Sequence, residues 1–365
     1  MLNVDKNSIE KAEVILNTSL LNEEIFFLEN EIGFKLKEIY PADSPKFASL
    51  EGFGLNIFLK LEKENSKYNL THIRVRLDKS SKKIKSKLLT SPGGNKVEFI
   101  IEQSYKIIKK FPNSIEINQN THTWNNGRAG MLYRDLLPSR YGGYIIASHI
   151  KLDSIGKVHD RVHYHNIDFQ VLYCLKGKVK LAYENQKNYI MFNKGDCILQ
   201  PPQIKHQVIE TYEPLEVIEI TSPAEHITKI NYDLKIPNKD KTSFDEKTKS
   251  FFLHYKHELQ GIDSIIPGFN EKKMGIYDAS AEFADLTILE SDNFNSFEFL
   301  HRNKILFIYV LDGSIKLIDD ITEHSLNTND CFTLPPNKKF SLFYLNKIKL
   351  LLLNISGKLD IKVFK

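Results

Sequence analysis

The chain has 365 residues, enough for two or three domains, and its 41% hydrophobic and 26% charged residues are typical of globular proteins. The net charge of +4 comes from scattered lysines without a basic stripe, so nothing in the composition indicates a nucleic-acid partner. Residues 1–21 contain no apolar signal core, and the longest apolar run, residues 350–353, is far too short to span a bilayer. Because the three cysteines (Cys174, Cys197 and Cys331) are far apart in apolar runs, we expect buried thiols, a cytoplasmic location and no membrane partner.

Residues 1–105 are predicted to form an α+β module. A short strand at 13–16 is followed by a helix over 23–32, which we expect to end at Gly33. Runs of β-forming residues then predict strands at 34–39, 47–50, 55–61, 70–77 and 96–101, with a turn at 92–95 before the last.

The resulting β-α-β-β-β order resembles one module of the glyoxalase/vicinal-oxygen-chelate fold. Residues 26–40 (FFLENEIGFKLKEIY) are similar to its helix-to-strand step, and residues 91–100 (SPGGNKVEFI) to its closing turn and strand. The resemblance implies a metal-ligand position near Glu98, which makes Glu98 and His72 candidate ligands. A metal site in that family takes two modules, whereas we find one here. We therefore predict a packing or dimerisation role for this module.

Residues 106–140 are predicted to connect this module to the next domain. The whole chain has 43 lysines and only seven arginines, and three of these arginines lie between residues 128 and 140. Arginine makes bidentate contacts to carboxylates, which lysine does not. Such arginines either line an entrance for an anionic substrate or, more commonly, tie a connector to a neighbouring domain. The candidates for substrate binding are Arg128 and Arg134 from this segment, and Arg161, which lies two residues before the histidines described next.

Residues 141–228 carry a histidine pattern that predicts a metal site. His163 and His165 are two residues apart, so on a strand their side chains point the same way. Gln170 begins the next run of β-forming residues, and His206 follows a Pro-Pro turn. Three imidazoles and a carboxamide inside a small barrel form a metal site.

The spacing resembles the cupin superfamily, whose two motifs read G-x5-H-x-H-x3-4-E-x6-G and G-x5-P-x-G-x2-H-x3-N. Here the motifs read His163-x-His165-x4-Gln170-x6-Gly177 and Gly195-x5-Pro201-x-Gln203-x2-His206-x3-Glu210. The departures are Gln170 for Glu, Gln203 for Gly, Glu210 for Asn, and Lys157 at the first glycine. The resemblance implies a mainly β chain built of cupin (double-stranded β-helix, or jelly-roll) barrels.

An internal repeat predicts a second cupin barrel over residues 266–365. Residues 169–184 (FQVLYCLKGKVKLAYE) resemble 305–320 (ILFIYVLDGSIKLIDD), and residues 195–208 resemble 329–342. The segment between the barrels, 229–265, is polar and lysine-rich and is predicted to be a linker with a helix near 250–259. The positions of the four candidate ligands are taken in the second barrel by Phe299, His301, Leu306 and Phe340. Because phenylalanine and leucine hold no cation, the second barrel is predicted to be structural.

Four neutral donors leave the full charge of the cation in place, which favours a small anionic oxygen ligand. Iron(II) is the favoured metal, with manganese, nickel and zinc as alternatives. Cupin dioxygenases use similar histidine-rich sites, which implies a dioxygenase acting on an enolisable or hydroxy-carbonyl acid. Cupins that linearise unsaturated uronates use three histidines and a glutamine, which implies instead a non-redox lyase or isomerase on a sugar acid. A non-catalytic metal or small-molecule binding protein is the third interpretation.

The catalytic base is left open by the sequence. Glu219, Tyr183 and His159 are the candidates. Strand alternation does not decide which of Tyr183, Gln200 and Glu219 point inward. Cupin barrels often pair through their sheets, so the resemblance also implies a homodimer.

Overall fold

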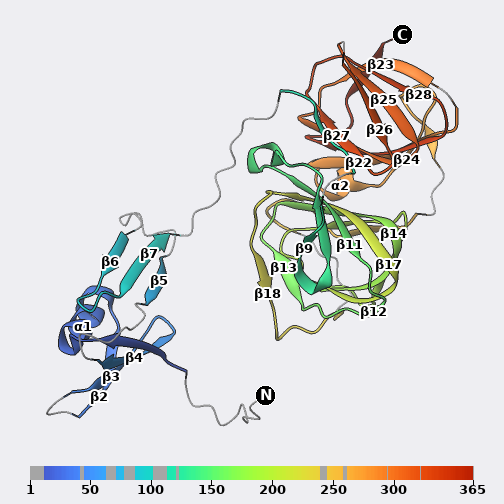
Figure 1. The fold of residues 1–365 in the computed structure, drawn as a ribbon. Coiled ribbons are helices and arrows are strands. Elements are labelled where there is room, and N and C mark those ends of the chain that lie inside the picture. Colours follow the sequence, from blue (N-terminus) through green and yellow to red (C-terminus); the bar gives the residue numbers. More distant parts are fainter. Residues whose placement is uncertain are drawn as a thin grey trace. The chain divides into compact units, whose positions relative to one another are not determined.

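The computed structural model describes residues 12–41, 45–62, 71–77, 87–101, 113–120, 123–238, 245–257, 261–293, 295–320 and 322–364. The chain divides into two compact units, Met1–Ser104 and Tyr105–Lys365. Strands make up most of the described elements (Figure 1), so the predicted mainly β class is confirmed. No described helix is long and apolar enough to cross a membrane.

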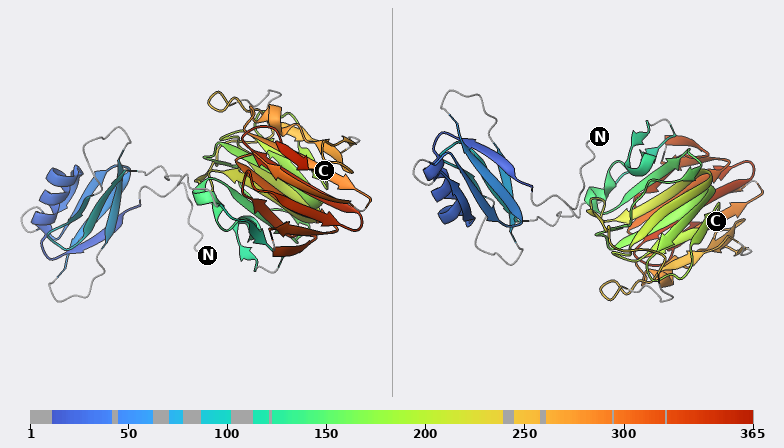
Figure 2. Two further views of the ribbon diagram at one scale, coloured as in Figure 1. Left: turned by 90° about the horizontal axis from the view of Figure 1, so that it is seen from above. Right: turned by 90° about the horizontal axis from the view of Figure 1, so that it is seen from below.

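The described residues of the first unit form one α-helix, with a π-helical continuation, and two sheets. The helix α1 (Leu21–Phe27) continues as a π-helical turn to Ile32 and ends at Gly33, whose φ of 99° is left-handed. One sheet has the order β1-β4-β3-β2 and the other β5-β7-β6, and β6 was not predicted. Figure 2 shows the helix against one face of the strands. The strands are β1 (Val14–Thr18), β2 (Lys35–Tyr40), β3 (Phe47–Gly52), β4 (Leu55–Leu61), β5 (His72–Leu77), β6 (Lys87–Thr90) and β7 (Lys96–Ile101).

The pairing in the two sheets is similar. β1 is parallel to β4, which is antiparallel to β3, and β5 is parallel to β7, which is antiparallel to β6. The β-α-β-β-β order predicted for the first part of this unit is present in the structure. Its resemblance to a glyoxalase module stays a prediction, and the predicted boundary at residue 105 lies outside the described residues.

A buried carboxylate ties the helix to the turn before β7. Glu24 is fully buried on α1, and its two oxygens accept hydrogen bonds from the backbone nitrogen of Gly93 at 2.8 Å and from Nδ2 of Asn95 at 3.0 Å. A Cβ at Gly93 would lie 2.5 Å from Oγ1 of Thr18, so only glycine fits this approach. The carboxylate therefore fastens the second sheet to the first.

Glu24→Ala is expected to destabilise the first unit by about 2–3 kcal/mol, because two buried donors lose a charged acceptor. Glu23→Ala, at the exposed neighbouring position, is the matched control and should change stability by less than about 0.5 kcal/mol. Thermal unfolding followed by circular dichroism measures both. Equal melting curves for the two variants would show that the carboxylate does not fasten the sheets.

The second unit begins with a barrel built around two long strands. β14 (Phe169–Tyr183) and β17 (His206–Ser222) pair antiparallel along their lengths, with several register shifts. Gly177 makes one bend in β14, because its φ is 87° and a Cβ there would lie 2.2 Å from the carbonyl oxygen of Pro214. The other strands are β11 (Ile146–Leu152), β12 (Gly156–Lys157), β13 (His163–His165), β15 (Ile190–Asn193), β16 (Cys197–Gln200) and β18 (Thr228–Ile230).

The second barrel repeats the first, as its sequence predicts. His163 lies opposite His206 in the β13–β17 pairing, and Phe299 lies opposite Phe340 in the β23–β28 pairing. The turn residue Gln203 has a φ of 60°, and Asn337 has a φ of 62° at the matching place. The elements are α2 (Ile276–Ala279), β22 (Ala284–Ser291), β23 (Asn295–His301), β24 (Ile305–Asp312), β25 (Ser314–Asp319), β26 (Thr322–Asn327), β27 (Cys331–Leu334), β28 (Phe340–Tyr344), β29 (Ile348–Ile355) and β30 (Ile361–Phe364).

Each repeat sends its first strand to the edge of the other barrel. β8 (Glu116–Asn118) pairs with β27 of the second barrel, and β19 (Leu253–Tyr255) pairs with β16 of the first. β9 (Asn125–Asn126) and β10 (Leu132–Asp135) then lead into β11, as β20 (Ile262–Asp263) and β21 (Asn270–Lys273) lead into β22. The predicted connector and linker therefore supply strands to both barrels. The helix predicted near 250–259 is wrong, because 253–255 are extended edge strand.

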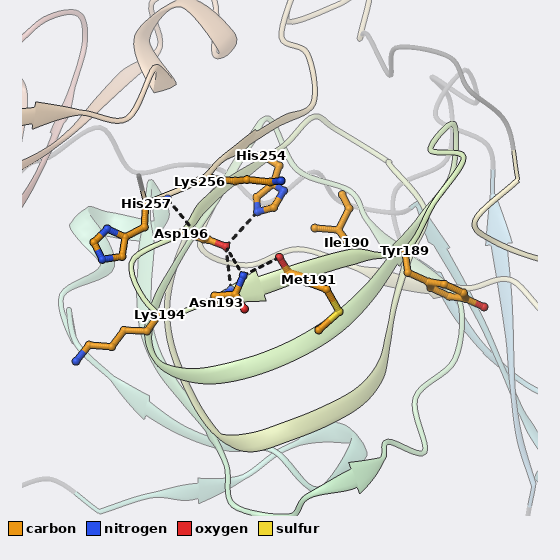
Figure 3. Close-up of a pocket in the computed structure, with 9 residues that line it drawn as sticks. All are labelled: Tyr189, Ile190, Met191, Asn193, Lys194, Asp196, His254, Lys256 and His257. Carbon is orange, nitrogen blue, oxygen red and sulfur yellow. Dashed lines mark hydrogen bonds and ion pairs between the residues drawn. The ribbon is translucent and has the colours of Figure 1, made fainter. Parts of the chain in front are cut away.

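Two equivalent aspartates hold these exchanged strands. In the first barrel, Asp196 accepts hydrogen bonds from the backbone nitrogens of Asn193 and His257, and His254 contacts it at 3.3 Å (Figure 3). In the second barrel, Asp330 accepts the same kind of bond from Asn120 at 2.7 Å. The surface pocket drawn in Figure 3, of about 610 Å³, thus lies over a structural clamp.

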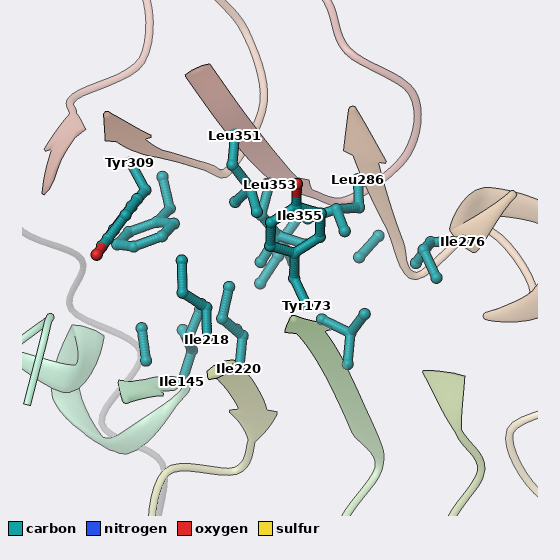
Figure 4. Close-up of a cluster of buried hydrophobic side chains, with 14 of the residues drawn as sticks. Ile145, Tyr173, Ile218, Ile220, Ile276, Leu286, Tyr309, Leu351, Leu353 and Ile355 are labelled. Carbon is teal, nitrogen blue, oxygen red and sulfur yellow. The ribbon is translucent and has the colours of Figure 1, made fainter. Parts of the chain in front are cut away.

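The two barrels share one apolar core (Figure 4). Tyr173, Ile218 and Ile220 of the first barrel pack with side chains of β22, β24 and β29 of the second. The three free cysteines are buried, as predicted, and Cys197 and Cys331 lie in this shared core. Because side chains of both barrels are buried in this core, the two barrels form one compact unit.

Arg134 is buried where the barrels meet. Its guanidinium donates to the carbonyl oxygen of Asn329 at 3.0 Å, to Nδ1 of His149 at 3.2 Å, and to Oδ1 of Asn120. His149 in turn donates from Nε2 to Glu216 at 2.9 Å. The arginine therefore joins β10, β11 and the second barrel, which is the tying role expected for a connector arginine.

Arg134→Met is expected to destabilise the second unit by about 2–3 kcal/mol, because methionine keeps the apolar stem but leaves buried acceptors unpaired. Arg140→Met is the matched control, since Arg140 forms a partly exposed ion pair with Asp135 and should contribute less than about 1 kcal/mol. Urea unfolding followed by fluorescence of Trp124, the single tryptophan, reports on this unit. Similar unfolding midpoints for both variants would contradict the assignment.

Candidate metal centre

The predicted histidines come together inside the first barrel. His163 and His165 lie on β13, and His206 is the first residue of β17. The ring centroids of His163 and His206 are 4.3 Å apart, and His165 lies 5.2 Å from each. One nitrogen from each of the three rings lies within 4.8 Å of the other two. This spacing is that of a metal site with three imidazole ligands.

Hydrogen bonds orient all three rings in the same sense. The Nδ1 atom of His163 donates to the carbonyl oxygen of Arg161 at 2.7 Å, and that of His206 to the carbonyl oxygen of Ile204 at 3.0 Å. Nδ1 of His165 contacts Oγ1 of Thr228 at 2.8 Å. The Nε2 atoms are therefore the free ones, and Nε2 of His163 is buried without a hydrogen-bond partner in the described part of the chain. Fixing Nδ1 in this way is how proteins present Nε2 to a metal.

Burial keeps these histidines neutral. It lowers the pKa of His163 and His206, and it lowers the pKa of His165 to about 2. Charges on neighbouring histidines act in the same direction on His165 and His206. A neutral imidazole is the form that binds a metal, so the rings are ready as ligands at neutral pH.

Gln170 has a buried amide oxygen that is available as a ligand. It is 1% exposed at the start of β14, and its Nε2 donates to Oε2 of Glu219 at 3.0 Å. Its Oε1 is buried and has no partner among the residues that the structure describes. The glutamate thus fixes which amide atom is left for a ligand. Three free imidazole nitrogens and an unpartnered amide oxygen fit a first-row divalent metal.

A small cavity of about 70 Å³ adjoins the centre. His206, Glu219, Tyr183 and Arg128 are among the residues that line it. The remaining lining residues are Met131, Tyr133, Ile150, Leu172, Leu181, Phe192, Gln200, Gln207, Val208, Leu215 and Val217. Tyr133 was missed by the sequence analysis, and it lies on β10 in the segment predicted as a connector. The walls are apolar and a few polar groups face them, which is typical of a substrate pocket.

Two charged groups of the cavity are held by defined partners. Arg128 pairs with Asp160 at 2.6 Å, and Asp160 also accepts a hydrogen bond from the backbone nitrogen of Val208. Burial raises the pKa of Glu219, against the opposing effects of Arg128, His226 and the hydrogen bond from Gln170. Glu219 therefore takes up a proton more readily than an exposed glutamate.

The other residues proposed from the sequence lie elsewhere. His159 is exposed, and Arg161 lies over the ring of Tyr232 at 5.4 Å; neither is among the cavity-lining residues. Arg134 is buried between the barrels. In the first unit, Nε of Arg74 donates to Glu98 at 2.7 Å, and His72 lies 3.6 Å from the same oxygen. In the described ranges, only the three histidines form a metal-type cluster of His, Cys, Asp or Glu.

The matching place in the second barrel is apolar. Phe299, Leu306 and Phe340 are each at most 2% exposed and belong to one hydrophobic core. The Nε2 atom of His301 donates to the carbonyl oxygen of Leu334 at 2.9 Å. The histidine that the repeat retains is thus a core residue with a backbone partner.

No protein-family model matches the sequence, and no curated protein matches it. Among solved structures, the chain is similar to salicylate 1,2-dioxygenase from Pseudaminobacter salicylatoxidans, with 12% identity, a TM-score of 0.53, and coverage of 72% of this chain and 92% of the dioxygenase. It is similar to the 11S globulin from Wrightia tinctoria, with 11% identity, a TM-score of 0.51, and coverage of 68% and 85%. At these identities the likeness shows the fold alone, and it confirms the predicted cupin fold.

Proposed function

We propose that the chain is a metal-dependent enzyme of small-molecule metabolism, with its active site at the centre formed by His163, His165, Gln170 and His206. The observation that carries the proposal is the convergence of three neutral imidazoles within 4.8 Å of one another. Gln170 is included because its buried amide oxygen has no partner in the described part of the chain. We propose iron(II) as the metal, with manganese, nickel and zinc as alternatives. When bound, such an ion supplies a Lewis acid and, if it is iron, redox chemistry with dioxygen.

The residues around the cavity have distinct roles in this proposal. Arg128 binds a carboxylate of the substrate, because a guanidinium is the planar donor that matches a carboxylate. Glu219 moves a proton to or from the substrate, since it lines the cavity and burial favours its protonated form. The apolar walls exclude water and leave room for a small substrate.

We propose a dioxygenase acting on a small enolisable or hydroxy-carbonyl acid as the first function. Support comes from the three histidines and from the likeness to a salicylate dioxygenase, as far as a shared fold carries. A non-redox lyase or isomerase on a sugar acid is the second candidate. It is favoured by Glu219, a proton-transfer group whose oxygen lies 3.0 Å from the amide nitrogen of Gln170.

Metal analysis and activity assays separate these functions. The full chain is purified without added metal, analysed for elements, and assayed against a panel of small hydroxy and keto acids. Iron with substrate-dependent oxygen uptake supports the dioxygenase. Turnover under argon with zinc, nickel or manganese supports the lyase or isomerase. Full metal occupancy without turnover of any panel member would contradict both and favour the non-catalytic binding protein, an interpretation in keeping with the likeness to an 11S globulin.

A further inference from the structure

Two buried polar side chains of the cavity have no role in the function proposed above, which gives proton transfer to Glu219. Gln200 ends β16 and is 2% exposed, and Tyr183 ends β14 and is 1% exposed. Gln200 lies opposite Gln170 in the β14–β16 pairing, and Tyr183 lies opposite His206 in the β14–β17 pairing. The pair therefore adjoins the metal centre without belonging to its ligands.

The hydrogen bond between these residues leaves the amide oxygen of Gln200 and the hydroxyl proton of Tyr183 without partners among the described residues. Nε2 of Gln200 donates to the hydroxyl oxygen of Tyr183 at 2.7 Å. Oε1 of Gln200 is then buried with no partner in the described ranges. The hydroxyl proton of Tyr183 has no acceptor among the hydrogen bonds of the described residues. Turning the amide over would make the Tyr183 hydroxyl the donor, and would leave its oxygen as an acceptor and the amide nitrogen of Gln200 as a donor.

Burial of such unpartnered groups destabilises the folded protein unless a ligand supplies the missing hydrogen-bond partners. A hydroxyl group fits both atoms at once, because it donates to Oε1 of Gln200 and accepts from Tyr183. A carboxylate fits less well, because it has no proton to donate to the free acceptor of the pair in either orientation of the amide. The two residues thus differ from Arg128 in the chemistry that they select.

We propose that Tyr183 and Gln200 bind a hydroxyl group of the substrate, so that the site selects a short hydroxy acid whose carboxylate is bound by Arg128. The inference rests on the proposed function for the role of Arg128. The cavity of about 70 Å³ limits the substrate to a few carbons, since pockets for drug-sized ligands measure roughly 300–1,000 Å³. The stacking of Tyr183 on His206, with ring centroids 5.8 Å apart, places the hydroxyl site beside the metal centre.

The test compares acids that differ by one hydroxyl group: glycolate with acetate, lactate with propionate, and 3-hydroxybutyrate with butyrate. Isothermal titration calorimetry measures binding to the full chain, both metal-free and loaded with redox-silent zinc. The hydroxylated member of at least one pair is expected to bind at least about tenfold more tightly. The preference should fall to within about threefold in Tyr183→Phe/Gln200→Leu, in which both polar partners are replaced and none is left orphaned. Tyr173→Phe removes a hydroxyl outside the cavity and should keep the preference.

Absence of any hydroxyl preference in the wild-type chain, including absence of binding, overturns the inference. A preference that survives the double substitution also overturns it, because the hydroxyl would then bind the metal or another group. Tyr183→Phe alone provides a second measurement if the double variant does not fold. Metal content is determined in the same samples. If the chain takes up no metal but prefers the hydroxylated acid, only the proposed function is contradicted. If the chain takes up metal but shows no preference for the hydroxylated acid, only this inference is contradicted.

Discussion

His206→Ala is expected to lose most of the bound metal while the second unit stays folded. His206 presents Nε2 to the centre, because its Nδ1 is engaged by the carbonyl oxygen of Ile204. Loss of an outer partner of a ligand already weakens metal binding by roughly 10–100-fold, so loss of the ligand itself should weaken it further. His206 lines the cavity, so its truncation enlarges an existing space and we expect a small effect on folding.

Elemental analysis of the purified variant gives its metal content, and Trp124 fluorescence during urea unfolding gives the stability of the unit. His159→Ala is the matched control, because this histidine is exposed and lies outside the cavity lining. The control should keep the wild-type metal content. If His206→Ala kept full metal stoichiometry as well, the ligand assignment would be wrong, and with it the proposed function.

The pairing of His163 and His165 in the candidate metal centre was predictable because its geometry is local. His163 and His165 face one way on any strand, and the repeat predicted that the second barrel would follow the first. What the pattern does not contain is the orientation of Gln170. That depends on Glu219, 49 residues later, which takes up the amide nitrogen and leaves the oxygen free. The placement of Gln200 beside Tyr183 is likewise a matter of register between strands.

The exchanged strands were not predictable for a related reason. β8 pairs with β27, more than 200 residues further along, and three residues of ordinary strand propensity carry no sign of a distant partner. A helix was predicted around β19, but pairing with β16 and the hydrogen bond from the backbone nitrogen of His257 to Asp196 outweigh local propensity there. Arg134 was singled out in the sequence because arginines are rare in this chain. Its role in joining the barrels follows from its burial, which the sequence does not show.

Phe340→Ala is expected to destabilise the second unit by about 3–5 kcal/mol, the usual effect of truncating a fully buried phenylalanine. The side chain is 1% exposed, and its ring centroid lies 6.2 Å from that of Phe299, its cross-strand neighbour. Leu345→Ala is the matched control on the same barrel, because Leu345 is 63% exposed and should change stability by less than about 0.5 kcal/mol.

Metal content distinguishes a structural second barrel from a functional one. Phe340 occupies in its barrel the place that His206 has in the first, so the two substitutions test equivalent positions. With the cation held only by the first barrel, Phe340→Ala should keep the wild-type metal content at temperatures where the unit remains folded. Metal loss in a folded Phe340→Ala variant would mean that the second barrel takes part in binding, and that its phenylalanines do more than fill a core. Because Phe340 is surrounded by apolar side chains, we expect an unchanged metal content and a lowered midpoint of urea unfolding.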